Sequence, residues 1–239
     1  MQVCITIDME QDCPPFRSTY NGVENGTPQL LELFKEEAIP ATFFTTGDVA
    51  RRYPQVVDAI VQSGHELGCH GDTHKRFGNM EPAEAREELR SASQTLRQHA
   101  PVVSFRAPNL DFPDSYVPFL RDEGYQVDSS RGRHKQGSFF TKPVVEEGMR
   151  RIPASIMPSA LRTPGPIRNA LCRLLESPAV LFFHPWEFTD MTREDLRYDI
   201  RFRTGEPALR SLRDTIRYYK RRKASFLRIS EVAVSPGAR

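Results

Sequence analysis

Apolar runs alternate with helical patterns along the whole chain, and this alternation constrains the fold more than any other feature. Short runs rich in β-branched and aromatic residues predict strands, whereas apolar residues three and four positions apart predict helices. The predicted strands are residues 3–7, 41–45, 66–69, 102–105, 125–127, 179–183 and 225–229. The predicted helices start at Pro28 and cover residues 54–63, 81–99, 113–123, 167–175 and 207–223. This order predicts a parallel sheet with helical crossovers, in one α/β domain over residues 1–239.

The stretch from residue 131 to residue 178 does not follow the alternation. Prolines at positions 143, 153, 158, 164 and 166 interrupt any long element, so we expect loops, short strands and the one helix near residues 167–175. His134 in this stretch is expected to be a structural or surface residue, and so is His65.

Composition excludes several classes of protein. A content of 38% hydrophobic residues is typical of a globular chain, and a net charge of +2 is too small to indicate a nucleic-acid partner. No run approaches the roughly 20 apolar residues of a membrane span, and no signal-like segment opens the chain. The four cysteines are widely spaced without a Cys-x-x-Cys pair. We therefore expect reduced thiols and a cytoplasmic location.

Two histidines four residues apart, His70 and His74, form the most informative local motif. On one turn this spacing places both imidazoles on the same side, where they can share a metal ion. A catalytic centre of the zinc type takes three protein ligands and leaves a position open, so a third ligand must come from elsewhere. Glu10 and Asp12, just after the first predicted strand, are the candidates. An isolated pair of this kind is more often a pair of surface histidines.

Further polar residues stand at the ends of predicted strands, where parallel α/β folds place their chemistry. Asp8 is the candidate general base and His184 the candidate acid. Arg106 would keep Asp8 ionised, and Asp128 would support the charged form of His184. Taken singly, each of these residues is more often a turn residue, a helix cap or a surface ion-pair partner. Together with the metal ligands they predict metal-assisted hydrolysis of an amide.

The same residues resemble the motifs of polysaccharide deacetylases of the NodB-homology type, the fourth carbohydrate esterase family. The matching stretches are Ile5–Asp12, His70–His74, Phe105–Asn109, Asp128–Ser130 and Phe182–Glu187. The resemblance implies a single distorted (β/α) barrel of about seven parallel strands. It also implies a divalent metal, with zinc as the leading candidate and cobalt, nickel and manganese as alternatives. It also implies that the amide after Pro108, on Asn109, helps to bind an oxyanion.

Three positions depart from the usual motifs. Asp-Met-Glu-Gln-Asp at residues 8–12 replaces the adjacent Asp-Asp pair and favours Glu10 as the third ligand, with Asp12 as the rival. Gly71 stands where serine or threonine is usual, and Phe182 where leucine is typical, so the pocket for the acyl methyl group is expected to differ in size. Trp186, beside the last motif, is either a core residue or a substrate platform.

The resemblance does not fix the substrate. The leading prediction is N-deacetylation of an amino sugar or glycan. A related hydrolase acting on formylated aminosugars, small cyclic amides or ureides is the second, and a glycan-binding protein without turnover is the third.

Overall fold

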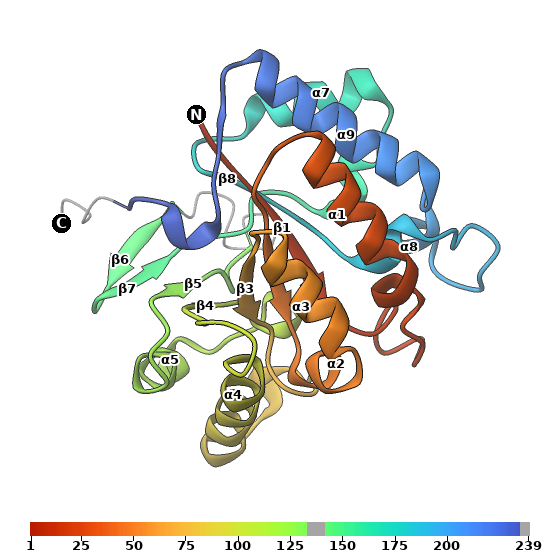
Figure 1. Ribbon diagram of the computed structural model, residues 1–239. Coiled ribbons are helices and arrows are strands. Elements are labelled where there is room, and N and C mark those ends of the chain that lie inside the picture. Colours follow the sequence, from red (N-terminus) through yellow and green to blue (C-terminus); the bar gives the residue numbers. More distant parts are fainter. Residues whose placement is uncertain (133–141, 235–239) are drawn as a thin grey trace.

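The computed structural model describes residues 1–132 and 142–234, and it contains one sheet with helices around its outside (Figure 1). The strands are β1 (Gln2–Met9), β2 (Thr42–Thr45), β3 (Glu66–Cys69), β4 (Ser104–Phe105), β5 (Val127–Asp128), β6 (Val144–Glu146), β7 (Met149–Arg151), β8 (Ala179–Phe183) and β9 (Ser225–Phe226). Their order across the sheet is β6-β7-β5-β4-β3-β2-β1-β8, and β9 pairs with β1. All pairs are parallel except β6 with β7.

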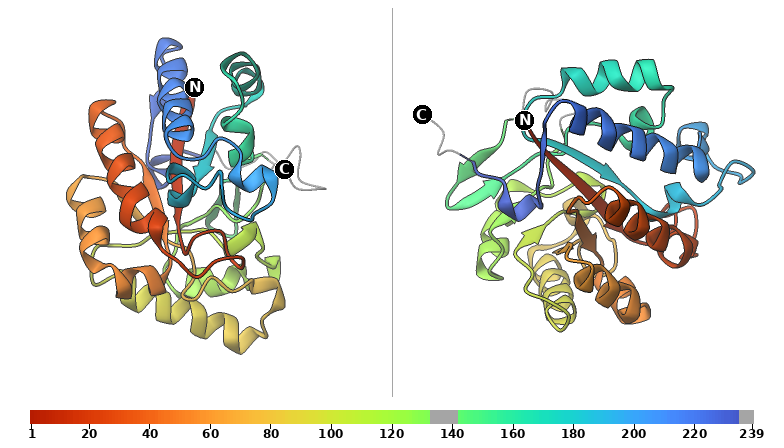
Figure 2. Two further views of the ribbon diagram at one scale, coloured as in Figure 1. Left: turned by 90° about the vertical axis from the view of Figure 1, so that its right-hand side faces the viewer. Right: turned by 45° about the horizontal axis from the view of Figure 1, so that its top comes forward.

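Helices connect these strands and cover the outside of the sheet in both views of Figure 2. The α-helices are α1 (Thr27–Glu36), α2 (Gly47–Arg52), α3 (Pro54–Gln62), α4 (Pro82–Leu96), α5 (Val117–Asp122), α6 (Pro158–Leu161), α7 (Gly165–Leu174), α8 (Tyr198–Arg201) and α9 (Glu206–Arg221). A π-helical turn, η1 (Gly22–Gly26), precedes α1. The 3-10 turns are η2 (Phe77–Asn79), η3 (Pro108–Leu110), η4 (Asp114–Tyr116), η5 (Pro185–Phe188) and η6 (Ile229–Glu231).

The sheet curls until its two ends meet. The chain after β7 forms a parallel bridge to β8 between Ile156 and Leu181, and the backbone N–H of Ser155 donates to the carbonyl of Val180 at 2.8 Å. This contact joins the β7 end of the strand order to the β8 end. The predicted distorted (β/α) barrel is confirmed, with the antiparallel β6 as an addition that the prediction did not contain.

Glu147 and Gly148 connect β6 to β7. Both have positive φ, which suits the tight turn of a two-residue hairpin.

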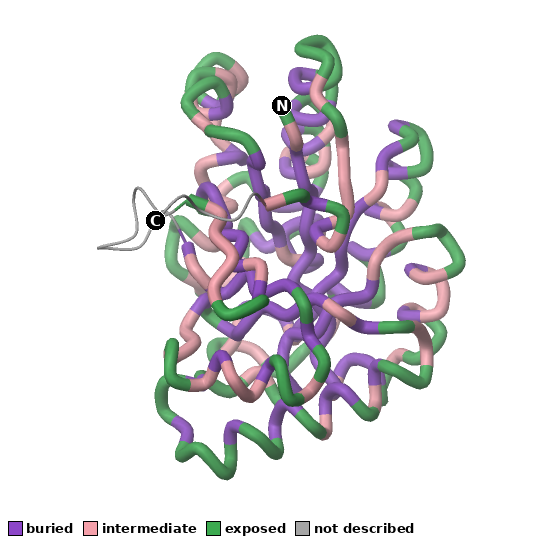
Figure 3. Tube along the Cα trace, turned by 90° about the vertical axis from the view of Figure 1, so that its left-hand side faces the viewer, coloured by how far each residue is buried: buried purple, intermediate pink, exposed green. Residues whose placement is uncertain are grey.

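Strand β1 runs through the middle of the core. Its odd-numbered residues Val3, Ile5 and Ile7 pack in the main hydrophobic cluster with residues of α1, α9 and β8, and none of the three is exposed. Its even-numbered residues face the other way, since successive side chains of a strand alternate. Thr6 and Asp8 lie on this second side, both buried. Figure 3 shows the continuous buried centre that results, with the exposed residues on the outer helices and loops.

Most predicted elements are present, with shorter ends. Strands β3 and β8 match the predicted residues, while the fourth and last predicted strands keep only two residues each. Helix α2 was not predicted, because its six residues are too short for a helical period; Thr46 caps it by accepting from the N–H of Val49. His65, expected to be a structural or surface residue, is partly buried, and His134 lies outside the described residues.

The four cysteines are free and buried, which confirms that they form no disulfide framework. Within residues 1–132 and 142–234, the helices are all too short or too polar to cross a membrane.

Candidate active site

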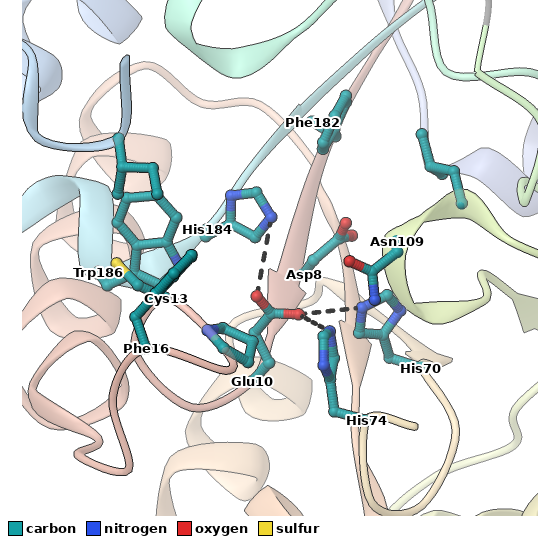
Figure 4. A pocket seen from close by; sticks show the side chains of 13 residues that line it. Asp8, Glu10, Cys13, Phe16, His70, His74, Asn109, Phe182, His184 and Trp186 are labelled. Atoms are coloured by element: carbon teal, nitrogen blue, oxygen red, sulfur yellow. Dashed lines mark hydrogen bonds and ion pairs between the residues drawn. The ribbon is translucent and has the colours of Figure 1, made fainter. Parts of the chain in front are cut away.

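A cavity of about 200 Å³ opens at the carboxyl ends of β1, β3 and β8. The strands deliver polar side chains to one side of it, and the loops after them supply apolar walls (Figure 4). The residues that line it are Asp8, Glu10, Cys13, Pro14, Phe16, His70, His74, Asn109, Leu110, Phe182, His184, Trp186 and Ile200. Nine of the eleven residues predicted for the site therefore meet in or directly behind this cavity, with Arg106 buried behind Asp8.

Glu10, His70 and His74 form a cluster whose ligand atoms all lie within 4.8 Å of one another. Glu10 Oε2 contacts the Nε2 atoms of both imidazoles, at 3.2 Å for His70. Nδ1 of His70 is 2.7 Å from the carbonyl oxygen of Arg106, which makes Nδ1 the donor and leaves Nε2 for a ligand. Two imidazoles and one carboxylate are a donor set that a zinc-like divalent ion prefers. The residues therefore fit a divalent metal site.

Charge in the cluster favours an ionised Glu10. Burial alone would raise the pKa of this carboxyl, but the His74 and His70 imidazoles, with His184 nearby, outweigh it and hold the pKa well below its usual range. A deprotonated carboxylate is the form that ligates a metal.

Asp12 is not part of this cluster, which corrects the alternative that placed it on the metal. The backbone turns after β1, and the carboxylate of Asp12 accepts hydrogen bonds from Thr19 Oγ1 at 2.7 Å, from Asn21 N at 2.8 Å and from Gly22 N at 2.9 Å. Thr19 and Asn21 belong to the loop that leads into η1, and Gly22 is the first residue of η1. Asp12 therefore orders this loop.

Asp8 lies beside the cluster and pairs with Arg106 as predicted. Arg106 is fully buried, and its Nη1 donates to Asp8 Oδ1 at 2.7 Å and to Thr6 Oγ1 at 2.8 Å. Its Nη2 donates to Ser129 Oγ at 2.9 Å, and its guanidinium lies over the ring of Phe44. These contacts fix the guanidinium and, through it, the carboxylate of Asp8.

Asp128 does not support His184, so that prediction is wrong. Its Oδ2 lies 2.5 Å from Nε of buried Arg151, and its Oδ1 accepts from the N–H and hydroxyl of Ser130. The Ser130 hydroxyl in turn accepts from the N–H of Ala107 at 2.9 Å. Asp128 therefore holds the loop that carries Arg106.

Glu187 is the partner of His184 that the sequence reasoning missed. Its Oε1 lies 3.0 Å from Nδ1 of His184 and accepts from the backbone N–H of the same residue at 2.9 Å. Burial lowers the pKa of His184, but the hydrogen bond with Glu187 and the charges of Glu10 and Glu187 outweigh it and raise the pKa to about 9. The pattern of a polar residue, proline and then glutamate three positions on is a capping-box signal that could have indicated this contact.

The predicted substrate-binding residues Asn109, Phe182 and Trp186 all line the cavity. Trp186 stacks on His184, with ring centroids 5.0 Å apart and planes 17° apart. Phe182 packs with Leu110 and Ala154 at the inner end of the wall. Five further lining residues were not predicted, because they come from irregular or very short segments in which no period shows: Cys13, Pro14 and Phe16 in the loop after β1, Leu110 in η3 and Ile200 in α8.

Comparisons with known proteins agree with this geometry. The family model for polysaccharide deacetylase matches residues 3–127. A chitooligosaccharide deacetylase from a Bradyrhizobium species is 33% identical over 90 residues, which is 36% of this chain and 41% of that protein. A peptidoglycan deacetylase from Helicobacter pylori is 30% identical over 110 residues, or 45% of this chain and 37% of that protein. The chain thus spans about two fifths of the curated relatives it matches.

Solved structures share the fold. A pseudoenzyme of carbohydrate esterase family 4 from Bacillus anthracis superposes with a TM-score of 0.66 at 19% identity, over 96% of this chain and 64% of that one. A family 4 carbohydrate esterase from Streptomyces lividans has a TM-score of 0.64 at 15% identity, over 99% of this chain and 98% of that one. With the family model matching more than half of its length, this chain belongs to the polysaccharide deacetylase family.

Proposed function

We propose that this chain is a metal-dependent hydrolase that removes the N-acetyl group from an amino sugar or glycan. The observation that carries the proposal is the convergence of Asp8, His184 and the Glu10–His70–His74 cluster on one cavity. The two curated relatives named above are deacetylases of chitooligosaccharide and peptidoglycan, which supports the same class of substrate.

Glu10, His70 and His74 would hold the divalent ion, and zinc is the metal we propose, with cobalt, nickel and manganese as alternatives. When bound there, a divalent ion supplies Lewis acidity, which polarises a carbonyl oxygen and makes water more acidic. The chain's own residues supply the proton transfers and the positioning.

Asp8 takes the proton of the attacking water, because its carboxylate lines the cavity beside the cluster and is oriented by Arg106. His184 gives a proton to the leaving amine from Nε2, the ring atom that faces Glu10 at 3.9 Å, while Nδ1 is held by Glu187. The backbone N–H of Asn109 is the proposed donor to the oxygen of the acyl group, where negative charge develops in the transition state.

The proposed occupant of the cavity, whose volume is about 200 Å³, is one acylated sugar unit. Phe182 and Leu110 form an apolar surface suited to the acyl methyl group. Formylated aminosugars, small cyclic amides and ureides fit the same chemistry and are the alternative substrates.

A direct assay tests the proposal. Purified protein loaded with zinc is incubated with acetylated chito-oligosaccharides, peptidoglycan fragments, formylated aminosugars and cyclic amides, and the released acid or free amine is measured. We expect acetate from the acetylated sugars, and none after the metal is removed by a chelator. Turnover of formylated or cyclic substrates alone would favour the second candidate. Binding of oligosaccharide without any product would favour the glycan-binding candidate, and the pseudoenzyme with this fold shows that the fold alone does not decide.

A further inference from the structure

The side of the cavity that carries His184, the proposed proton donor, is called the acid side. It contains a buried carboxylate whose two oxygens face different partners. Glu187 lies in η5, directly after β8, and is fully buried. Its Oε1 binds both Nδ1 and the backbone N–H of His184, so one oxygen fixes the ring and the turn that carries it. With Nδ1 donating to this oxygen, Nε2 is the ring atom directed toward Glu10 and the cavity.

The second oxygen of Glu187 faces a buried arginine. Arg162, at the end of α6, places its Nε 3.0 Å from Glu187 Oε2, and both side chains are almost completely buried. A buried carboxylate needs such a compensating charge, since an unpaired charge in the interior is strongly unfavourable. Glu187 thus joins Arg162 on one side to His184 on the other.

Arg162 is itself held in place by the backbone. Its Nη1 donates to the carbonyls of Ile200 at 2.8 Å and Phe202 at 2.6 Å, and its Nη2 donates to that of Asp199 at 3.0 Å. These carbonyls belong to α8 and the residue after it, and Ile200 lines the cavity. The guanidinium therefore connects the wall of the cavity to the carboxylate behind His184.

We propose that Glu187 and Arg162 are positioning residues for His184: Glu187 sets the orientation of the imidazole, and Arg162 holds Glu187. The inference rests on the proposed function in that His184 is the proton donor. It replaces the support by Asp128 that the sequence predicted, and neither residue lies within the stretch that the family model matches.

Glu187→Gln is the central test. Glutamine keeps the size and one acceptor oxygen but loses the charge that Arg162 faces, so the ring of His184 loses its fixed orientation. We expect kcat to fall about 10- to 100-fold with little change in KM, because a misplaced acid loses part of its usual contribution. Metal content should equal that of wild type, since the cluster residues are untouched.

A matched control separates positioning from loss of a buried glutamate. Glu37 is also buried and pairs with Arg217 and Lys220, away from the cavity. Glu37→Gln should leave kcat unchanged. For the arginine, Arg162→Lys should lower kcat, since the single nitrogen of lysine cannot donate to three carbonyls and also pair with the carboxylate of Glu187. Arg168→Lys is the buried control, because Arg168 pairs with Asp214. If Glu187→Gln does not fold, Arg162→Lys carries the test.

A double variant shows whether Glu187 acts through His184. If it does, Glu187→Gln combined with His184→Ala should be no slower than His184→Ala alone, because the ring to be positioned is gone. The proposal would be overturned if the fall in kcat of the double variant equalled the product of the two single falls, or if Glu187→Gln kept the wild-type kcat.

Fluorescence gives a readout that does not need turnover. Trp186 is the one tryptophan in the sequence, and it stacks on His184. In Glu187→Gln its emission should move from the wild-type spectrum toward that of His184→Ala, while Glu37→Gln should match wild type. Unchanged emission in Glu187→Gln would overturn the positioning role. A wild-type protein without deacetylase activity would instead refute the proposed function, and the fluorescence comparison would still decide the positioning of the ring.

Discussion

The two sides of the cavity use buried arginines in different ways. On the side that carries Asp8, the base side, Arg106 donates directly to the carboxylate of Asp8. On the acid side, Arg162 faces Glu187, and Glu187 contacts His184. The difference follows from charge: a guanidinium stabilises an anionic base by direct contact, whereas beside an imidazole it would oppose the positive charge that an acid must carry. A carboxylate between the two cations resolves this conflict.

The two sides also differ in where their residues lie along the chain. Asp8 and Arg106 stand at or just after β1 and β4, both inside the region matched by the family model. Arg162, Glu187 and Ile200 come from the part of the chain beyond it, much of which is irregular. The base side is therefore built at the ends of two strands of the sheet, β1 and β4, and the acid side from loops and short helices packed over the end of β8.

The largest expected effect concerns the metal cluster that both sides share. His70→Ala, His74→Ala and Glu10→Ala should each remove most of the bound metal and all measurable activity, since three ligands are needed for a stable catalytic site. Asp12→Ala should keep the metal, because its carboxylate is occupied by three loop donors. Metal analysis of the purified variants checks this. Full metal content in Glu10→Ala together with loss in Asp12→Ala would reverse the assignment of the third ligand.

The next effect tests the base side alone. Asp8→Asn should lower kcat by about 10²–10⁴-fold, the usual contribution of a positioned general base. Asparagine keeps an oxygen for Arg106 to donate to, so metal content and the circular-dichroism spectrum should match wild type. Loss of the metal in this variant would make Asp8 a ligand, and the base would then have to be another group.

Asp128→Asn tests whether the two sides are supported separately. The change removes the charge that pairs with buried Arg151, so the free energy of unfolding should fall by about 2–4 kcal/mol. The emission of Trp186 should stay as in wild type, because Asp128 holds the Arg106 loop and does not contact His184. Thermal melts and fluorescence measure the two responses. A spectrum that changes as in Glu187→Gln would show that Asp128 also governs the acid side.

The smallest effect uses a histidine whose ring nitrogen contacts a backbone amide. His65, before β3, accepts a hydrogen bond on Nδ1 from the N–H of Ala41 at 3.2 Å. Burial, with the charge of Arg228, lowers its pKa from 6.5 to about 4. The folded state therefore favours neutral His65, and its contribution to stability is complete above pH 6.5 and is lost as the pH falls toward 4.

Because His65 is partly exposed, this loss should amount to about 1–2 kcal/mol. Urea unfolding at several pH values measures it, with His65→Gln as the comparison. The difference in stability between the two proteins should shrink as the pH falls. A difference that does not change between pH 7 and pH 4 would show that His65 does not titrate differently on folding.

Sequence periodicity located most of the sheet. The apolar runs before Asp8, His70 and His184 became β1, β3 and β8 because each is buried on both sides and bounded by turn residues. The short strands expected between residues 131 and 178 are present as β6 and β7, but their antiparallel pairing was not predicted. The short helices α2, α6 and α8 were missed, since segments of four to six residues carry too few positions for a period to show.

The sequence by itself determined which strand ends carry the polar residues of the site. Parallel strands end at the same edge of a sheet, so the polar residues that follow β1, β3, β4 and β8 had to converge. Alternation along β1 also places Asp8 and Glu10 on one side. The strand ends and the alternation of side chains depend on neighbouring residues only, so they can be predicted from the sequence.

Only the tertiary structure decided which carboxylate contacts which partner. Glu10 reaches the histidines and Asp12 does not, because the chain turns after β1 and gives Asp12 to the loop donors. Glu187 supports His184 and Asp128 does not, because Glu187 follows His184 in the turn after β8, whereas Asp128 on β5 meets Arg151 of the adjacent strand β7. A buried charge must be matched by a group within a few ångströms, and the residues that come that close depend on the packing of distant segments rather than on any spacing in the sequence.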